Sequence, residues 1–294
     1  MKKFSVLSIL VLLSGFVFAQ EADEVDDGYN KFSTKGIHKS DIMWQKSVLR
    51  AIDLREKQNE PLMSNGREMP KILIDAVKAG VVTAYKSDSL SDGTPLTKSE
   101  FLKNIQIPST EVELTEEEKE FAANEDSDDD WGDEKGGDEG GDSESSAGGD
   151  SGVEYFFAKQ LYQMQVKEDM IFDKQRSVMY YDILALGMFV PADNPDNIKG
   201  IELPIAWFSF KELNEKVFKD NPDAIWYNPY NDAEHRSLSD AFELRLFSSY
   251  IIKVSNPADE YIVDIYGGNP QTGIMASEWK AYELLEYEHN LWEF

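Results

Sequence analysis

The sequence contains no cysteine and only three histidines among its 294 residues. Without cysteine the chain cannot form a disulfide framework, a thiolate metal site or a cysteine nucleophile, and it cannot carry a lipid on cysteine. Three histidines leave few ligands for a zinc or iron site. Composition therefore excludes several kinds of site but does not by itself indicate a function.

Basic residues are also scarce, with 29 lysines and arginines against 56 aspartates and glutamates. The formal net charge of −27 makes nucleic acid and anionic membrane surfaces unfavourable partners for the chain as a whole. The length is sufficient for one large domain or two small ones, with a substantial core.

The longest apolar run lies at the N-terminus. Lys2 and Lys3 precede an apolar stretch over 4–18, and Ala19 fits the small-residue position before a cleavage site. This pattern predicts a secretory signal peptide over 1–19. The alternative, an N-terminal membrane anchor, fits less well because the run is short and is interrupted by serines. We therefore expect export, and a mature chain without a membrane-spanning segment.

Composition divides the rest of the chain into four segments. Residues 20–36 are polar and predict a flexible N-terminal tail, 37–123 predict an N-terminal lobe, and 153–294 predict an aromatic-rich C-terminal lobe. Between the lobes, 124–152 holds 12 acidic residues and one lysine among glycines and serines, a net charge of −11. Such a segment repels itself and cannot bury apolar surface, so it predicts a disordered acidic linker.

Capping residues and apolar runs predict both helices and strands. Ser40 or Asp41 is expected to begin a helix that runs to Lys57, and Pro70 is expected to begin one over 71–79 that stops at Gly80. Thr97 and Thr115 each have a glutamate three residues later, the spacing of a capping box. The other expected starts are Ser209 for a helix over 211–218, Ser237 for 238–247 and Ser277 for 278–292. The expected strands are 81–85, 177–190, 203–209, 249–254 and 260–266. Because the two kinds of element cluster rather than alternate, we predict an α+β fold of helices with short mixed or antiparallel sheets, in two lobes joined by the acidic linker.

Helical periodicity places several charged residues on apolar faces. Arg55 would lie beside Trp44 on the apolar face of the 40–57 helix, with Arg50 and Asp53 on the other side. Such a charge needs a carboxylate or carbonyl partner within the chain, or a partner protein that docks there, and both readings stay open. The candidate interface or ion-pair residues are Trp44, Arg50, Asp53, Arg55, Asp173, Arg176, Arg245, Trp279 and Glu288.

Enzyme motifs are missing from the sequence, which has no G-x-S-x-G, no HExxH, no P-loop and no G-x-G-x-x-G. We therefore expect a protein that is not an enzyme and uses no cofactor or metal. The acidic run fails as a calcium loop, because Trp131 stands where glycine is required and Gly137 where glutamate is required. An alternative function is a periplasmic or surface glycan-binding module with an aromatic stacking platform. Its candidate residues are Trp207, Trp226, Tyr227, Tyr230 and Trp292.

Three long segments carry a resemblance to a known family. They are MWQKSVLRAIDLREKQNEPL at 43–62, VKEDMIFDKQRSVMYYDILALG at 166–187 and NDAEHRSLSDAFELRLFSSYIIKVSNP at 231–257. With GVVTAY at 80–85 and the closing EYEHNLWEF, the chain resembles the GldN/PorN family of the gliding-motility and type IX secretion machinery. The resemblance covers both sides of the acidic segment, which is not part of the pattern.

The resemblance implies a structural role and no catalytic residues. It implies a ring of several copies of the chain with a GldK/PorK-type outer-membrane lipoprotein, and contact with a GldM/PorM-type inner-membrane motor protein. It also implies a location in the periplasm, held at the inner face of the outer membrane by the lipoprotein.

Overall fold

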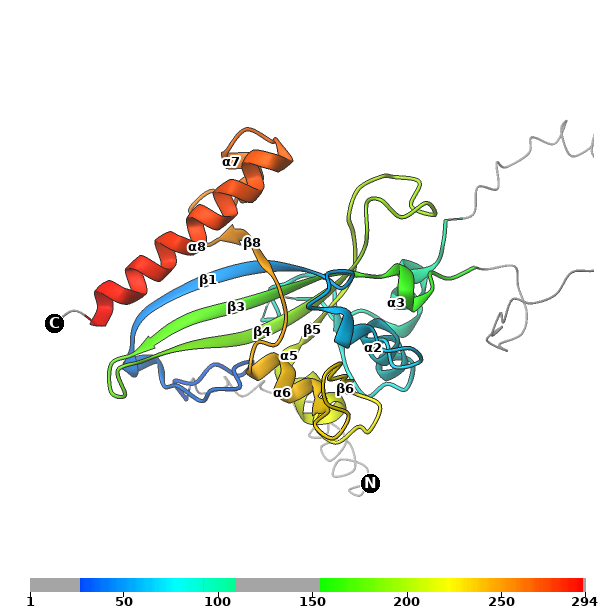
Figure 1. Cartoon of the computed structure of the whole chain (residues 1–294), viewed down its shortest axis with the longest axis horizontal. Coiled ribbons are helices and arrows are strands. Elements are labelled where there is room, and N and C mark those ends of the chain that lie inside the picture. Colours follow the sequence, from blue (N-terminus) through cyan, green and yellow to red (C-terminus); the bar gives the residue numbers. More distant parts are fainter. Residues whose placement is uncertain (1–26, 92, 109–153, 293–294) are drawn as a thin grey trace, which may run out of the picture.

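The computed structural model describes residues 27–91, 93–108 and 154–292 and has an α+β fold, as predicted (Figure 1). A six-stranded antiparallel sheet has the strand order β2-β5-β4-β3-β1-β8, and a small second sheet pairs β6 with β7. The predicted signal peptide, residues 20–26 of the predicted N-terminal tail, the acidic linker and the Thr115 cap lie outside the described residues. Among the described residues, no helix combines the length and apolar character needed to cross a membrane.

The predicted helix over 40–57 is wrong. Residues 42–53 form the long strand β1 (Ile42–Asp53), preceded by a single 3-10 turn, η1 (Lys39–Asp41), which His38 caps. β1 lies inside the sheet between β3 and β8, and its second half is covered on both faces. Burial on both faces removes the apolar–polar alternation that marks a half-exposed strand, so the apolar residues could be fitted to a helical period.

The centre of the sheet is the hairpin of β3 (Gln163–Asp173) and β4 (Val178–Val190), which pair over their whole length. β4 matches the predicted strand, whereas β3 was not predicted. β5 (Leu203–Ser209) and β8 (Tyr250–Val254) also match predicted strands. The other strands, which are short, are β2 (Ala84–Tyr85), β6 (Ile225–Trp226) and β7 (Arg236–Ser237).

Two strand predictions need correction. Only the last two residues of 81–85 pair with the sheet, as β2. The predicted strand over 260–266 is instead a short helix, α7 (Ile262–Ile265), which leads into α8 (Pro270–Trp292).

Most predicted caps begin helices in the structure. Pro70 lies in the first turn of α2 (Met69–Lys78), Thr97 and Glu100 form a capping box at α3 (Lys98–Ile105), and the Ser237 hydroxyl caps α6 (Leu238–Glu243). Ser209 precedes α5 (Phe210–Leu213) and the π-helical turn η4 (Asn214–Phe218), but its side chain makes no capping bond. α8 begins seven residues before the predicted Ser277, which is buried within it. The remaining 3-10 turns are η2 (Glu60–Met63) and η3 (Ala158–Gln160).

The segments on the two sides of the acidic linker, expected as two lobes, share one sheet. β1 comes from the first segment and pairs with β3 and β8 from the second. The chain ends that flank 109–153 are also paired, through an isolated bridge between Gln106 and Tyr155 and a 2.9 Å bond from Ile107 N to Glu154 O. The two segments therefore form one folded unit.

The helices cover the sheet at different places. α2, α5 and α6 pack on the largest apolar cluster, which contains Leu73, Phe210 and Phe242. α8 packs on a second, smaller cluster that contains Val48 and Ala276. In Figure 1, α8 lies beside β8 on one side of the sheet, whereas α2 and α3 lie at the other end of the long strands.

Candidate functional site

Glu168 is the centre of a charged cluster on the sheet. Its side chain on β3 is fully buried. Arg50 on β1 donates from Nε to one carboxylate oxygen, and Arg245 donates from Nη1 to the other at 2.5 Å and from Nη2 to the first at 3.3 Å. Burial of an unpaired charge is very costly, but here each charge has a partner within the chain.

Strand register explains how Arg50 reaches Glu168. Glu168 lies directly opposite Val48 in the β1–β3 pair, and Arg50 lies two residues further along the same face of β1. Diagonal neighbours of this kind are about 7–8 Å apart, within the reach of an arginine side chain. The pair is therefore a cross-strand contact, not a contact along a helix.

Arg245 reaches the cluster from the segment after α6. Its backbone has a φ of +55°, in the left-handed region that costs a non-glycine residue about 1–2 kcal/mol. Its guanidinium lies over the rings of Tyr181 and Phe247, at 4.9 and 5.5 Å from their centroids. The ion pair with Glu168 and these cation–π contacts offset the backbone cost.

Tyr181 extends the cluster to α8. Its hydroxyl donates a 2.9 Å hydrogen bond to Glu288 Oε2. Burial first, and the hydrogen bond to the Glu288 carboxylate second, raise the pKa of Tyr181 to about 12. We call Arg50, Glu168, Arg245, Tyr181 and Glu288 the Glu168 network.

The Glu168 network separates two apolar regions of one sheet face. Along β3, Met164 and Val166 belong to the cluster under α2, α5 and α6, whereas Met170 and Phe172 belong to the cluster under α8. Every second residue of β3 points to this face, and Glu168 lies between Val166 and Met170 in that series. The network therefore joins the end of α6, three strands and α8 at one point.

Aromatic pairs fix the second half of α8 to the sheet. Trp44 on β1 stacks on Tyr287 with ring centroids 4.9 Å apart. Phe172 on β3 meets the edge of Trp292 at 5.6 Å. Trp44, a predicted candidate, therefore contacts the chain's own C-terminal helix.

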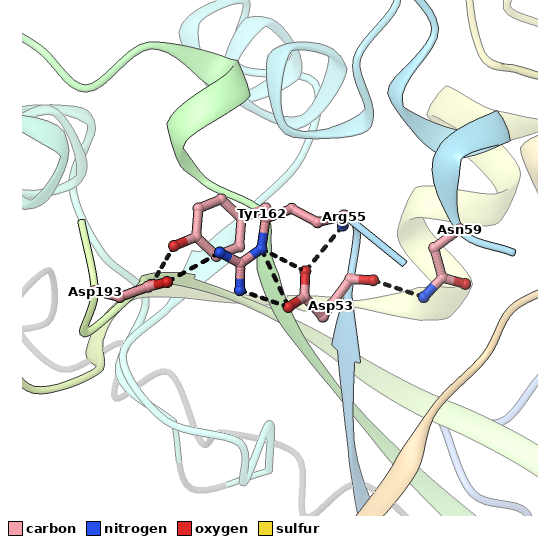
Figure 2. A network of polar contacts seen from close by, with 5 residues as sticks. All are labelled: Asp53, Arg55, Asn59, Tyr162 and Asp193. Atoms are coloured by element: carbon pink, nitrogen blue, oxygen red, sulfur yellow. Dashed lines mark hydrogen bonds and ion pairs between the residues drawn. The ribbon is translucent and has the colours of Figure 1, made fainter. Parts of the chain in front are cut away.

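A second polar network surrounds Arg55, just beyond the end of β1 (Figure 2). The Arg55 guanidinium bonds Asp53 Oδ2 at 2.8 Å and Asp193 Oδ2 at 2.9 Å, and it lies 3.8 Å from the centre of the Tyr162 ring. The Tyr162 hydroxyl donates a hydrogen bond to Asp193 Oδ1, and Asn59 Nδ2 donates one to the Asp53 carbonyl at 2.7 Å. Arg55 is thus bound by carboxylates, but its side chain is 54% exposed and lies on no helix.

The electrostatics of this second network follow its contacts. The hydrogen bonds from Tyr162 and then from Arg55 lower the pKa of Asp193. Burial first, and the bond to Asp193 second, raise the pKa of Tyr162 to about 12. The network therefore favours a charged Asp193 and a neutral Tyr162.

Asp173 and Arg176 pair locally at the turn between β3 and β4. Arg176 Nη1 lies 2.9 Å from Asp173 Oδ2, and Gln175 N donates to Asp173 Oδ1 at 2.8 Å. Burial raises the pKa of Asp173, but the hydrogen bonds from Gln175 and Arg176 outweigh it and lower the pKa overall. This arrangement stabilises the hairpin turn.

The structure brings only some of the candidate residues together. The Glu168 network contains Arg50, Arg245 and Glu288, and the network around Arg55 contains Asp53 and Arg55. Asp173 and Arg176 pair at the hairpin turn. Trp44 and Trp279 belong to none of these three groups. Sequence reasoning missed Glu168, Tyr181, Tyr162 and Asp193. Glu168 had a readable signal, because it is the single charged residue in an alternating apolar series along β3.

The candidate glycan platform assembles only in part. Trp207 is buried in the core, and Trp292 lies on α8. Trp226, Tyr227 and Tyr230 line one groove of about 850 Å³ beside η2, where Tyr227 N bonds the Pro61 carbonyl at 3.2 Å. Within the part of the chain that the structure describes, no three histidine, aspartate or glutamate side chains gather as metal ligands would.

Comparison with known proteins gives one family match. The family model described as "Gliding motility associated protein GldN" matches residues 37–293, which is most of the chain. The search of curated proteins found no match.

Proposed function

Because the chain belongs to the GldN family of gliding motility associated proteins, we propose that it is a non-enzymatic structural subunit of the gliding-motility and type IX secretion machinery. In this proposal several copies form a ring with a GldK/PorK-type outer-membrane lipoprotein and contact a GldM/PorM-type motor protein. The signal-peptide pattern over 1–19 supports export, and the lipoprotein would hold the chain at the inner face of the outer membrane. The family match over 37–293 is the observation that carries the proposal.

The arrangement of the charged residues supports a structural role. Glu168 and Asp193 are used in ion pairs and hydrogen bonds that join segments far apart in the sequence. The Glu168 network ties α8 to the long strands β1, β3 and β4, which are 12, 11 and 13 residues long. A stiff unit of this kind suits a subunit that must keep its shape within an assembly.

Co-purification from the cell envelope tests the proposal. A tagged copy of the chain is recovered from detergent-solubilised envelope, and the recovered proteins are quantified. We expect a GldK-type lipoprotein in a fixed ratio to the chain. Recovery of the chain alone, across a range of mild detergents, would refute the proposed role.

One observation favours glycan binding as a second candidate function. Tyr230 is 92% exposed and lines the same groove as Trp226 and Tyr227, which is the arrangement of a stacking platform. Retention of the purified chain on peptidoglycan or polysaccharide, lost in Tyr230→Ala and kept in the exposed-tyrosine control Tyr282→Ala, would support it. Equal retention of both variants would count against the groove.

A further inference from the structure

The outer face of α8 is apolar although it lies on the surface. This face consists of Ile274, Met275, Trp279, Tyr282 and Leu285, whose exposed fractions range from 57 to 71%. At 3.6 residues per turn these five positions lie within one side of the helix over about three turns, or roughly 17 Å. Tryptophan and tyrosine are among the residues that contribute most to protein–protein binding.

The opposite side of α8 makes the contacts with the sheet. Its buried residues are Gly273, Ala276 and Ser277, and Leu284 and Leu291 pack against the smaller apolar cluster. A surface helix of a globular protein normally carries polar residues on the side away from the core. α8 has large apolar residues there, which is the pattern of an interaction site.

Two carboxylates frame the outer face. Glu278 and Glu286 lie four residues before and four residues after Tyr282, so they share its side of the helix. Within the described residues neither makes a salt bridge, whereas neighbouring Glu283 pairs with Lys280 at 2.6 Å. A partner that places lysine or arginine against them would complement this face in both charge and apolar character.

We propose that the outer face of α8 docks an amphipathic helix of another protein. Its apolar stripe covers Trp279 and Tyr282, and its lysine or arginine side chains meet Glu278 and Glu286. The inference rests on the proposed function only in that a subunit of an assembly needs such a contact. It adds the position of the contact and the chemistry of the partner.

The charges argue against two other occupants. A second copy that packs its α8 antiparallel and symmetrically about Tyr282 brings Glu278 of one copy against Glu286 of the other, which places like charges together. Helices that lie on membrane surfaces carry lysine and arginine on their polar side, whereas α8 carries glutamates. A basic helix of a different protein avoids both conflicts.

Site-specific photo-crosslinking in cells tests the proposal. A photoreactive phenylalanine analogue replaces Trp279 in the full chain, and the crosslinked peptides are identified by mass spectrometry. We expect crosslinks to one helical segment of another protein, with an apolar stripe flanked by lysine or arginine. Crosslinks mainly to the chain itself or to lipid, or a yield no higher than from the same analogue at exposed Tyr230, would overturn the proposal.

Charge reversal gives a matched second test. In the crosslinking chain, Glu278→Lys with Glu286→Lys should reduce the yield about tenfold or more, because both reversals oppose a basic partner. The control is Glu215→Lys with Glu234→Lys, which changes the net charge equally at two exposed positions away from α8. An equal loss in both double variants, or no loss in either, would overturn the proposal. Unchanged melting temperatures would show that the variants fold.

The two proposals fail in different ways. If the chain co-purifies with the lipoprotein but the α8 reversals leave the crosslink unchanged, the proposed function stands and the docking surface is wrong. If the crosslink maps to a basic helix and depends on Glu278 and Glu286, but no GldK-type lipoprotein co-purifies, the docking surface stands and the proposed function is wrong.

Discussion

Replacing Glu168 by alanine should strongly destabilise the fold. The substitution leaves Arg50 and Arg245 close together with no carboxylate between them. Removal of one partner from a buried ion pair costs about 3–5 kcal/mol, because the remaining charge is left unpaired. The arginine side chains are 16% and 28% exposed, so water offsets part of this loss and we expect a decrease near the lower limit, about 3 kcal/mol.

Two substitutions at Arg245 separate the ion pair from the backbone strain. Arg245→Ala loses the contacts with Glu168, and because alanine has a Cβ, the variant still bears the cost of the left-handed backbone. Arg245→Gly loses the same contacts, but glycine adopts a φ of +55° without that cost. We therefore expect the glycine variant to be more stable than the alanine variant by about 1 kcal/mol.

Urea unfolding of the purified mature chain measures these differences. Tryptophan fluorescence and circular dichroism give the free energy of unfolding, and equal m values show that the unfolded states are comparable. Lys57→Ala, at an exposed position, serves as the control and should stay within about 0.5 kcal/mol of the wild type. The reasoning is refuted if Glu168→Ala also stays within that range, or if the two Arg245 variants have equal stability.

Four further predictions concern other parts of the chain. Because the pKa of Tyr181 is raised to about 12 from its ordinary value near 10, folding stability should fall as the pH rises between these values, and Tyr181→Phe should reduce that alkaline loss in pH-dependent unfolding. Gly187→Ala should cost about 1–3 kcal/mol in urea unfolding, because an added Cβ would stand 2.8 Å from the buried ring of Trp207. Arg55→Ala should cost only about 1 kcal/mol or less, since its side chain is 54% exposed and its ion pairs are hydrated; a loss above about 3 kcal/mol would contradict this. Replacing 124–152 by a short glycine–serine linker should leave the melting temperature nearly unchanged, because the flanking chains already pair and loop closure changes by only about 0.6 kcal/mol per doubling of length.

Sequence reasoning predicted the elements whose signals are local. The capping box of Thr97 and Glu100, the Ser237 cap and the apolar runs of β4 and β5 depend on neighbouring residues, and all appear in the structure. β1 was misread because its pairing partners come from residues more than a hundred positions later in the chain. The local sequence of β1 also permits a helical periodicity. Its pairing inside a sheet, which no local pattern reveals, makes it a strand instead.

The same long-range pairing explains why the Glu168 network could not be predicted. Arg50 was placed on the polar side of a helix, and its true partner lies on β3, a strand that was not recognised. Once β3 is read as a strand, its alternation leaves Glu168 as a single charge on an apolar face, and such a charge requires a cation from a neighbouring strand or loop. That rule selects Arg50 on β1 from the register but not Arg245, whose approach depends on a left-handed residue after α6. The part of the site that follows from strand register could therefore be derived from the sequence, whereas the part that depends on tertiary packing of α6 could not.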